Sequence, residues 1–201
     1  MDRKRDIFSG EDPIKLFKEW LLEAEVTELN DPNAIALASV DSEGLPNVRI
    51  ILLKGISKDS FVFYTNYGSV KSQELEASKK ASFVIHWKSL RRQIRVRGNV
   101  VLENSSLADS YYASRSLKSR IGAWASRQSF PLESREELES KFESYSVSLG
   151  SEPARPPFWG GYRLIPIEIE FWADGPNRLH DRYRWVRANV DSNWRVTRLQ
   201  P

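Results

Sequence analysis

The chain has 201 residues, of which 40% are hydrophobic and 28% charged, and its formal net charge is +3 at pH 7. These proportions are those of a globular protein and exclude extended disorder, and the length predicts a single domain over residues 1–201. The chain has no cysteine and two histidines, which excludes a disulfide scaffold, a thiolate metal site, a cysteine nucleophile and a histidine-rich metal site. We therefore predict no metal.

The sequence offers no membrane-spanning segment. The strongest apolar run, Ile50–Leu53, lies between Arg49 and Lys54 and is far shorter than the roughly 18 residues that a membrane helix needs. The N-terminal residues Met1–Asp6 carry charges with no apolar stretch behind them, so we expect no signal peptide. We expect a cytoplasmic protein, not bound to membranes, with a flexible N-terminal segment over residues 1–11.

The first predicted elements are one helix and several strands. Asp12 and Pro13 fit an N-cap followed by proline at the first helical position, and apolar residues recur at helical spacing over about 13–26. The period then changes to two, which is typical of strands. We predict a helix over about 70–79, behind a serine N-cap, and strands over 34–40, 47–54, 61–65, 81–87 and 91–102.

The second half begins with helical patterns. Residues 106–148 are predicted to be helical with a break near Pro131, and the prolines at 153, 156 and 157 indicate an extended linker. Strands return at about 160–173, 182–188 and 193–199. Six or more strands at hairpin-like spacing, with few helices between them, predict an antiparallel barrel that is mainly β with flanking helices (α+β).

Familiar nucleotide motifs are missing from the sequence. It contains no glycine-rich dinucleotide fingerprint, no phosphate loop and no paired-histidine metalloprotease motif. A bound nucleotide would therefore have to be held by side chains and isolated backbone amides.

The first candidate site combines Arg49, Lys54, Ser69 and Lys71. Ser69 and Lys71 flank the start of a predicted helix, where free amides favour a phosphate, and the Arg49 fork suits phosphate oxygens. The alternative is that these charges are only solvated. Arg49 and Lys54 also point to opposite faces of a regular strand, so either a bulge brings them together or they serve two sites.

The second candidate is a row on one strand face, formed by Arg91, Gln93, Arg95 and Arg97. Cations on a solvated strand that discourage edge pairing are an equally good interpretation of the arginines. Gln93 differs from them because its amide can donate and accept at once, which suits the edge of a heterocycle.

A third candidate is a helix face that carries Tyr111, Arg115 and Ser119. Their i, i+4, i+8 spacing places them on one face if the helix is unbroken. Two hydroxyls and a guanidinium could hold a second phosphate. From spacing alone, a solvated helix face is the favoured interpretation.

The fourth candidate is the segment Arg178–Arg182. In a strand, Arg178, His180 and Arg182 would point to one side, and two guanidiniums beside an imidazole should disfavour its charged form. Trp172, just upstream, fits core packing or the wall of a planar ligand site. Two phosphate cradles, a glutamine and this row would suit two phosphorylated heterocycles bound side by side.

These segments together resemble the pyridoxine (pyridoxamine) 5′-phosphate oxidase family. The resemblance runs in order from about Asp12 to the last residue, and the combination is highly specific although each motif alone is weak. The matching segments are Arg49–Lys54, Phe63–Asn66, Arg92-Gln93, Ile121–Trp124, Gln128-Ser129, Phe158–Gly161, Glu170–Trp172, Asn177–Arg182 and Arg198–Pro201.

The resemblance implies an FMN-binding split β-barrel that works as a homodimer with FMN at the subunit interface. By the family's pattern, the FMN contacts are Arg49, Ile50, Ile51, Leu52, Leu53, Lys54, Tyr64, Thr65, Lys71, Gln93, Gln128, Ser129, Trp172 and Arg182. The substrate contacts it implies are Lys54, Tyr111, Arg115, Ser119, Arg178, Leu179 and His180. Of these, Arg178 and His180 would be the catalytic pair beside the pyridine ring.

The reaction implied by the resemblance oxidises pyridoxine 5′-phosphate or pyridoxamine 5′-phosphate to pyridoxal 5′-phosphate. A hydride passes to the flavin, and dioxygen reoxidises it to give hydrogen peroxide, with ammonia released from the amine substrate. The chain departs from the family where Val70 precedes Lys71, since the family commonly has arginine there. We therefore expect weaker FMN binding unless another cation takes its place.

Three alternatives remain. A phenazine-pathway flavin oxidase shares the C-terminal pattern, but Lys54, Tyr111 and Arg115 would be unnecessary for a substrate without phosphate. A non-catalytic flavin-binding protein is the second. A nucleic-acid module using the arginine rows is the third, and the small excess of positive charge and core-like spacing of the aromatic residues argue against it.

Overall fold

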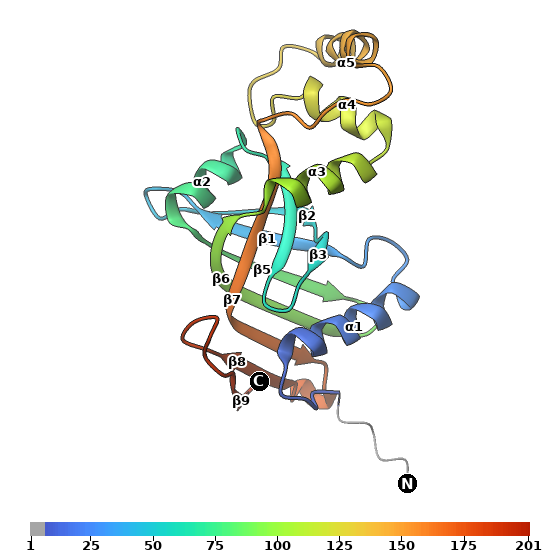
Figure 1. Ribbon diagram of the computed structural model, residues 1–201. Helices are drawn as coiled ribbons and strands as arrows, with labels where there is room; N and C mark the ends of the chain where they lie inside the picture. Colours follow the sequence, from blue (N-terminus) through green and yellow to red (C-terminus); the bar gives the residue numbers. More distant parts are fainter. Residues whose placement is uncertain (1–6) are drawn as a thin grey trace.

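The structure is a computed structural model that describes residues 7–201. In these residues one antiparallel sheet has the strand order β2-β1-β5-β6-β7-β4-β3, and β8 and β9 extend it from β7 (Figure 1). The sheet curls into a barrel, and the last two strands, β8 and β9, lie below this barrel (Figure 1). The strands are β1 (Ala34–Val40), β2 (Pro46–Leu52), β3 (Gly55–Ile56), β4 (Phe61–Asn66), β5 (Lys80–Trp87), β6 (Arg92–Leu102), β7 (Trp159–Ala173), β8 (Asp181–Val186) and β9 (Arg195–Leu199).

The long strands β6 and β7 form the spine of the sheet. Their pairing shifts register between Arg97 and Gly98, at a β-bulge, an irregularity of the kind that bends a strand. A side chain at Gly98 would place its Cβ 2.1 Å from the carbonyl oxygen of Ile165, so only glycine allows this close approach. Because β7 also pairs with β4 and β8, it connects the barrel with the C-terminal hairpin.

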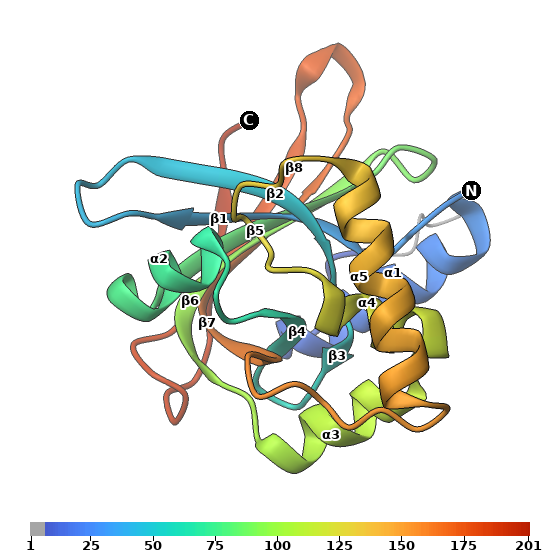
Figure 2. The same ribbon diagram turned by 90° about the horizontal axis from the view of Figure 1, so that it is seen from above.

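Helices cover the barrel at two places. The helices α1 and α2 pack beside the sheet, whereas α3, α4 and α5 lie together at its upper end, with α5 across α4 (Figure 2). They are α1 (Pro13–Thr27), α2 (Val70–Ser78), α3 (Ser105–Ser114), α4 (Leu117–Ala125), α5 (Arg135–Leu149) and the short 3-10 helix η1 (Pro176–Arg178). No described helix is long and apolar enough to cross a membrane.

An aromatic core lies between α1 and the inner face of the barrel. Phe17, which is fully buried, has ring centroids of Phe61 and Phe83 at 4.8 and 6.2 Å. Trp20 packs edge-on against Phe171 at 5.1 Å. Burial of one such ring contributes about 1.5–3 kcal/mol, so these contacts fix α1 on the sheet. The core fills this end of the barrel, and the site lies at the other end.

The alternating pattern predicted the strands well, and the class that is mainly β with flanking helices is confirmed. Two boundaries differ in ways that concern the site. The strand predicted over 47–54 ends at Leu52, and the helical region 106–148 divides into α3, α4 and α5. The first division falls at Arg115, whose backbone is extended, and Ser116 begins α4 as its N-cap.

The N-terminal segment predicted to be flexible, 1–11, lies partly outside the described residues. Within the described part, Phe8 is buried and its ring centroid lies 5.6 Å from Trp20 and 4.7 Å from Tyr183. The backbone oxygen of Ile7 accepts a 3.0 Å hydrogen bond from the Trp20 indole. These contacts fasten residues 7 and 8 to the core, and the flexibility of the segment stays a prediction.

Candidate active site

A cavity of about 780 Å³ opens at the upper end of the barrel, between β2, β4, α2, α3 and α4. It brings together most of the residues singled out in the first half of the sequence. Those lining it are Arg49, Ile50, Ile51, Leu52, Lys54, Tyr64, Thr65, Lys71, Tyr111, Arg115, Ser119, Gln128 and Ser129.

Arg49 and Lys54 both line this cavity, although their odd spacing predicts opposite faces. The reason is that β2 ends at Leu52 and the chain turns at Leu53. Leu53 therefore points into the core, where it is 3% exposed, and is not among the cavity residues. The backbone N–H of Lys54 donates to the oxygen of Val62 at 2.8 Å, which fixes the new direction.

The Arg49 guanidinium is already paired with a carboxylate. Its Nη2 donates to Glu74 Oε2 at 3.1 Å, and its Nη1 donates to Ser39 Oγ at 2.5 Å. Ser39 and Asn47 donate in turn to the same carboxylate. Burial favours a higher pKa for Glu74, but these hydrogen bonds and the Arg49 charge outweigh it and lower that pKa. Glu74 thus fixes Arg49 and offsets its charge.

Lys71 lies at the same end, nearly buried at the start of α2. Its ammonium donates to Thr65 Oγ1 at 3.0 Å, Ser69 Oγ at 3.1 Å and Gln128 Oε1 at 2.9 Å. Burial, and then the positive charge of Arg49, lower the pKa of Lys71 to about 8. Ser69, expected beside the phosphate, is fully buried instead and donates to the Asn66 oxygen.

The other end of the cavity is aromatic. Tyr64 and Tyr111 are stacked with ring centroids 4.1 Å apart, and Trp159 lies nearly parallel to both at 5.6 and 6.1 Å. The Arg115 guanidinium sits 4.8 Å from the Trp159 ring centroid, which is a cation–π contact. Its Nη1 atom is buried and makes no hydrogen bond within the described residues. An unpaired donor of this kind is a place for an anion.

Tyr111, Arg115 and Ser119 meet in the cavity, but not by the predicted route. They do not share one unbroken helix, because Tyr111 belongs to α3, Arg115 caps its end and Ser119 belongs to α4. Ser116 accepts from the Ser119 backbone N–H at 3.3 Å and starts α4 in a new direction. The bend keeps the three side chains beside the same space.

A second group of predicted residues lies elsewhere, on the sheet that continues into β8. Gln93, Trp172 and Arg182 are neighbours in one cross-strand row of β6, β7 and β8. Arg182 donates to Glu170 Oε1 from both Nε and Nη2, at 2.9 and 2.8 Å. Glu170 is nearly buried, so this pair fixes the guanidinium.

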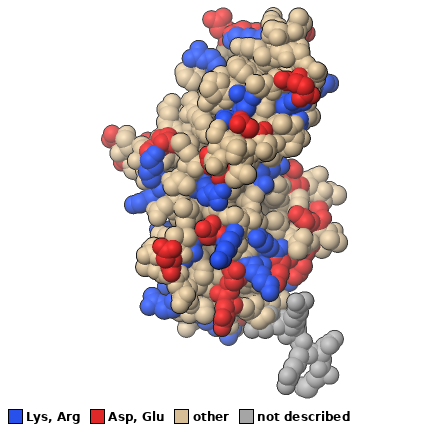
Figure 3. Space-filling model, viewed as in Figure 1, with Lys and Arg blue, Asp and Glu red and all other residues tan. Residues whose placement is uncertain are grey.

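The predicted arginine row is only partly formed. Arg91 precedes β6 and has a left-handed φ of 51°, so it is not on the strand face. Arg95 and Arg97 are on that face and pair with Glu170 and Glu168 at 3.4 and 3.6 Å. Positive and negative side chains also lie side by side over the face drawn in Figure 3. This mixture does not form the single-sign stripe that a nucleic-acid site needs.

The segment Arg178–His180 is not a strand, which corrects the predicted alternation. Arg178 ends η1, with φ values of 56° at Asn177 and 62° at Arg178, and β8 begins only at Asp181. The loop is so tight that a Cβ at Gly175 would lie 2.2 Å from the Leu179 oxygen, so the position requires glycine. The charged partner of the His180 imidazole is the Asp174 carboxylate, at 3.3 Å, rather than the two arginines.

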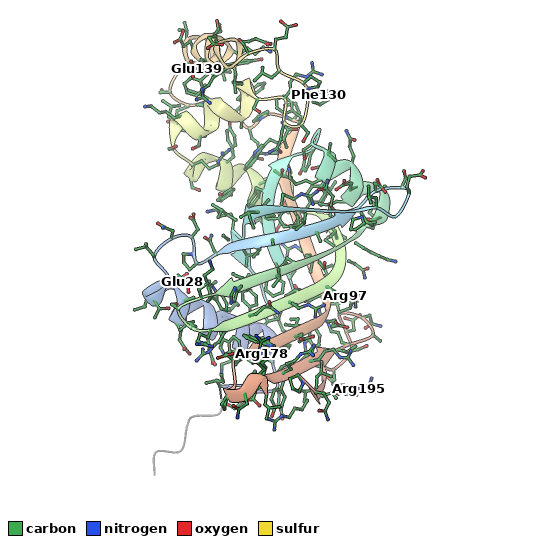
Figure 4. All side chains as sticks on the ribbon, turned by 180° about the vertical axis from the view of Figure 1, so that it is seen from behind. Glu28, Arg97, Phe130, Glu139, Arg178 and Arg195 are labelled. Carbon is green, nitrogen blue, oxygen red and sulfur yellow. The ribbon has the colours of Figure 1, made fainter. Side chains whose placement is uncertain are left out.

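His180 also packs on Trp172, with ring centroids 4.6 Å apart. Trp172 is only partly buried despite this contact. Leu179 and His180 line a hollow with the C-terminal residues Arg198–Pro201. Figure 4 shows Arg178 and Phe130 at opposite ends of the molecule. Phe130 follows the cavity residue Ser129 directly, and Arg178 is not among the residues that line the cavity of its own chain.

Two residues with clear contacts at the cavity were not among the predicted site residues. Trp159 supports Arg115, and its place in the matched Phe158–Gly161 segment was the signal for it. Glu74 fixes Arg49, but as a carboxylate beside an expected phosphate it carried no signal in the sequence.

Comparison with known proteins identifies this combination. Residues 21–148 match the family profile described as pyridoxamine 5′-phosphate oxidase. The chain belongs to the pyridoxamine 5′-phosphate oxidase family. Residues 159–201 match the profile described as the pyridoxine 5′-phosphate oxidase C-terminal dimerisation region, which includes the predicted site residues Trp172, Arg178, Leu179, His180 and Arg182. The family resemblance drawn from the sequence is thus confirmed.

Relatives agree over the whole length. The chain is 59% identical to a pyridoxine/pyridoxamine 5′-phosphate oxidase of Ruegeria sp. and 60% identical to one of Cereibacter sphaeroides, covering 100% of each chain. Among solved structures, PhzG from Burkholderia lata in complex with tetrahydrophenazine-1-carboxylic acid has a TM-score of 0.90 at 36% identity, with 96% and 95% of the two chains covered.

A second solved structure supports the fold alone. A pyridoxamine 5′-phosphate oxidase-related, FMN-binding protein from Nostoc punctiforme has a TM-score of 0.76 at 17% identity, covering 96% of this chain and 100% of that one. The predicted split β-barrel fold is confirmed.

Proposed function

We propose that the protein is an FMN-dependent oxidase that converts pyridoxine 5′-phosphate and pyridoxamine 5′-phosphate to pyridoxal 5′-phosphate, with dioxygen as the electron acceptor. The observation that carries this proposal is the buried, unpaired Nη1 of Arg115 in a cavity lined by Lys54, Tyr111 and Ser119. One further cation and two hydroxyls around this buried guanidinium donor suit a phosphate monoester. The full-length relatives with this activity support the same assignment.

The opposite end of the cavity fits the phosphate of FMN. Lys71, Thr65 and Gln128 form a compact set of polar groups there, and Ser129 lies beside the start of α2, where its Oγ accepts from the Val70 N–H at 3.3 Å. A helix start with a buried ammonium is a suitable anion site. When bound, FMN supplies the hydride acceptor and passes the electrons to dioxygen.

The remaining assigned residues require a second copy of the chain. Gln93, Trp172, Arg178, Leu179, His180 and Arg182 are absent from the cavity lining. Val48 and Ile50 on β2 are 64% and 68% exposed at the mouth of the cavity, an apolar edge that a partner subunit would cover. We infer a homodimer in which these six residues of one subunit complete the cavity of the other, as the match to a dimerisation region supports.

In this arrangement the protein binds and orients. Arg115 and Lys54 hold the substrate phosphate, Tyr64 and Tyr111 form an apolar wall, and Arg178 orients the substrate ring from the partner. Arg178 is well placed for such a role because it is exposed at the tip of a tight loop. The cytoplasmic location stays a prediction.

A phenazine-type oxidase is the second candidate, because PhzG is a close structural match at 36% identity. The Arg115 site argues against it, since a carboxylated tricycle without phosphate would not need both Lys54 and Arg115 at this end.

The deciding experiment is the visible spectrum of the purified protein under anaerobic conditions. Pyridoxine 5′-phosphate should bleach the flavin band, and air should restore it while pyridoxal 5′-phosphate and hydrogen peroxide accumulate. A flavin band that ignores this substrate but is bleached by a dihydrophenazine carboxylate would move the assignment to the phenazine type. A band that ignores both would indicate a flavin-binding protein without this activity.

A further inference from the structure

The end of β7 carries an aspartate that joins two elements. Asp174 pairs through Oδ2 with the Arg91 guanidinium, and its backbone N–H donates to the Arg91 oxygen at 3.1 Å. Its other carboxylate oxygen, Oδ1, lies 3.3 Å from Nδ1 of His180. Asp174 and His180 are both largely buried, with side chains 24% and 23% exposed. The contacts with Arg91 therefore hold the Asp174 carboxylate in its place beside the imidazole.

Two groups compete for the same imidazole nitrogen. The backbone N–H of Gly175 also lies 3.3 Å from His180 Nδ1 and can donate to it. Nδ1 can accept from Gly175 only without a proton, and it can donate to Asp174 only with one. A bond to an ionised carboxylate is roughly twice as strong as a neutral one, so Asp174 favours the protonated Nδ1.

The ring plane is fixed as well. Trp172 packs against the imidazole with centroids 4.6 Å apart and an interplanar angle of 47°. The tautomer and the orientation of the ring are thus set by different neighbours. With the single proton of the neutral ring on Nδ1, Nε2 has a free lone pair.

We propose that Asp174 is a positioning residue that holds His180 in the Nδ1–H tautomer, so that Nε2 accepts a hydrogen bond from the substrate. The inference rests on the proposed function, which places His180 against the substrate ring. An acceptor at Nε2 suits both proposed substrates, because the alcohol and the amine each offer a donor. The amine in its ammonium form can only donate, so a donor at this position would not match it.

The tautomer can be read directly by two-bond 1H–15N correlation spectra of the uniformly 15N-labelled holoprotein, at about pH 8 where imidazoles are mostly neutral. The chain has only two histidines, so His86→Gln assigns the signals. We expect the Nδ1–H form of His180 in the wild type and the Nε2–H form in Asp174→Ala. Asp181→Ala is the matched control, because Asp181 pairs with Arg198 instead, and it should leave the Nδ1–H form.

An Nε2–H form in the wild type, or an unchanged tautomer in Asp174→Ala, would overturn the inference without any reference to turnover. In kinetics, Asp174→Ala should lower kcat/KM for pyridoxine 5′-phosphate about tenfold, the loss expected for one hydrogen bond, with unchanged FMN content. Asp174→Asn keeps an acceptor oxygen, so it should retain the Nδ1–H form and recover most of kcat/KM, and it provides the test if the alanine variant does not fold.

A changed tautomer with unchanged kcat/KM would also overturn the positioning role. Failure of the proposed function gives a different result, since the wild type would then show the Nδ1–H form and no reduction of its flavin by pyridoxine 5′-phosphate.

Discussion

The Arg115 guanidinium lies 4.8 Å from the centre of the Trp159 ring, and its buried Nη1 makes no hydrogen bond within the described residues. A buried donor without a partner costs about 1–3 kcal/mol, and more when it is charged. Burial accordingly lowers the pKa of Arg115. The arrangement is unfavourable by itself and becomes favourable when an anion accepts from Nη1.

This relationship predicts that Arg115→Met separates stability from substrate binding. Methionine fills the space over Trp159 without a buried charge, so the free energy of unfolding in urea should stay equal or rise by about 1 kcal/mol. The KM for pyridoxine 5′-phosphate should rise about a hundredfold, the loss expected for a charged hydrogen bond.

Arg127→Met is the control for this substitution. Arg127 also lies over an aromatic ring, that of Phe130 at 4.4 Å, but it does not line the cavity. Its KM should be that of the wild type. A wild-type KM in Arg115→Met would contradict the assignment of Arg115 to the substrate phosphate.

The lowered pKa of Lys71 predicts that FMN binding weakens at alkaline pH. Burial, with Arg49 second, brings this pKa to about 8, and a bound phosphate stabilises the charged ammonium. The Kd of FMN should therefore be constant below about pH 8 and increase by up to about tenfold per pH unit above it. Quenching of flavin fluorescence measures it between about pH 7 and about pH 9.5.

Three comparisons test whether Lys71 causes this pH dependence of FMN binding. Lys71→Met should remove the pH dependence and weaken binding, whereas Lys79→Met, a change at an exposed lysine, should retain it. Riboflavin, which lacks the phosphate, should show no such dependence in the wild type. The pH dependence of folding has the opposite direction in the apoprotein. Between about pH 8 and pH 10.5 the Lys71 ammonium keeps its proton in the unfolded chain but loses it in the folded one, so this lysine makes the stability rise with pH.

Val70→Arg should tighten FMN binding. Val70 lines the phosphate end of the cavity and is 43% exposed, so an arginine there can reach the anion without being buried. The other arginine nearby, Arg49, is offset by Glu74. We expect Kd to fall about five- to tenfold at low salt and the gain to shrink as salt increases. Val101→Arg, at a valine 45% exposed outside the cavity, should change nothing.

Much of this fold was predictable because its strands alternate and its helices have distinct caps. The burial of β1 alternates at every residue, and Asp12 caps α1 with a 2.8 Å bond to the Ile14 N–H. The break between α3 and α4 was not predictable, because serine occurs inside helices as well as at N-caps. Only the structure shows that the Ser116 hydroxyl caps α4. Local patterns identify elements, but side-chain competition for backbone groups sets their ends.

The candidate site was predictable in composition rather than in pairing. The residue types around the cavity came from the sequence, yet the neutralising contact of Glu74 with Arg49 joins α2 to β2 and depends on tertiary packing. The left-handed backbone at Arg178 likewise depends on the tight loop after Gly175. Spacing along the chain carries no information on such contacts.

Arg115 lines the cavity of its own chain and Arg178 does not, which predicts that two variants, each impaired at low substrate concentration, can restore each other. If each site combines the cavity of one subunit with the Arg178 loop of the other, a heterodimer of Arg115→Met and Arg178→Ala contains one intact site and one doubly altered site. Random reassociation of the two variants should then recover about a quarter of the wild-type activity at low pyridoxine 5′-phosphate concentration. Activity is measured after co-refolding, with each variant refolded alone as the control. Recovery no greater than the sum of the two variants would contradict the shared site.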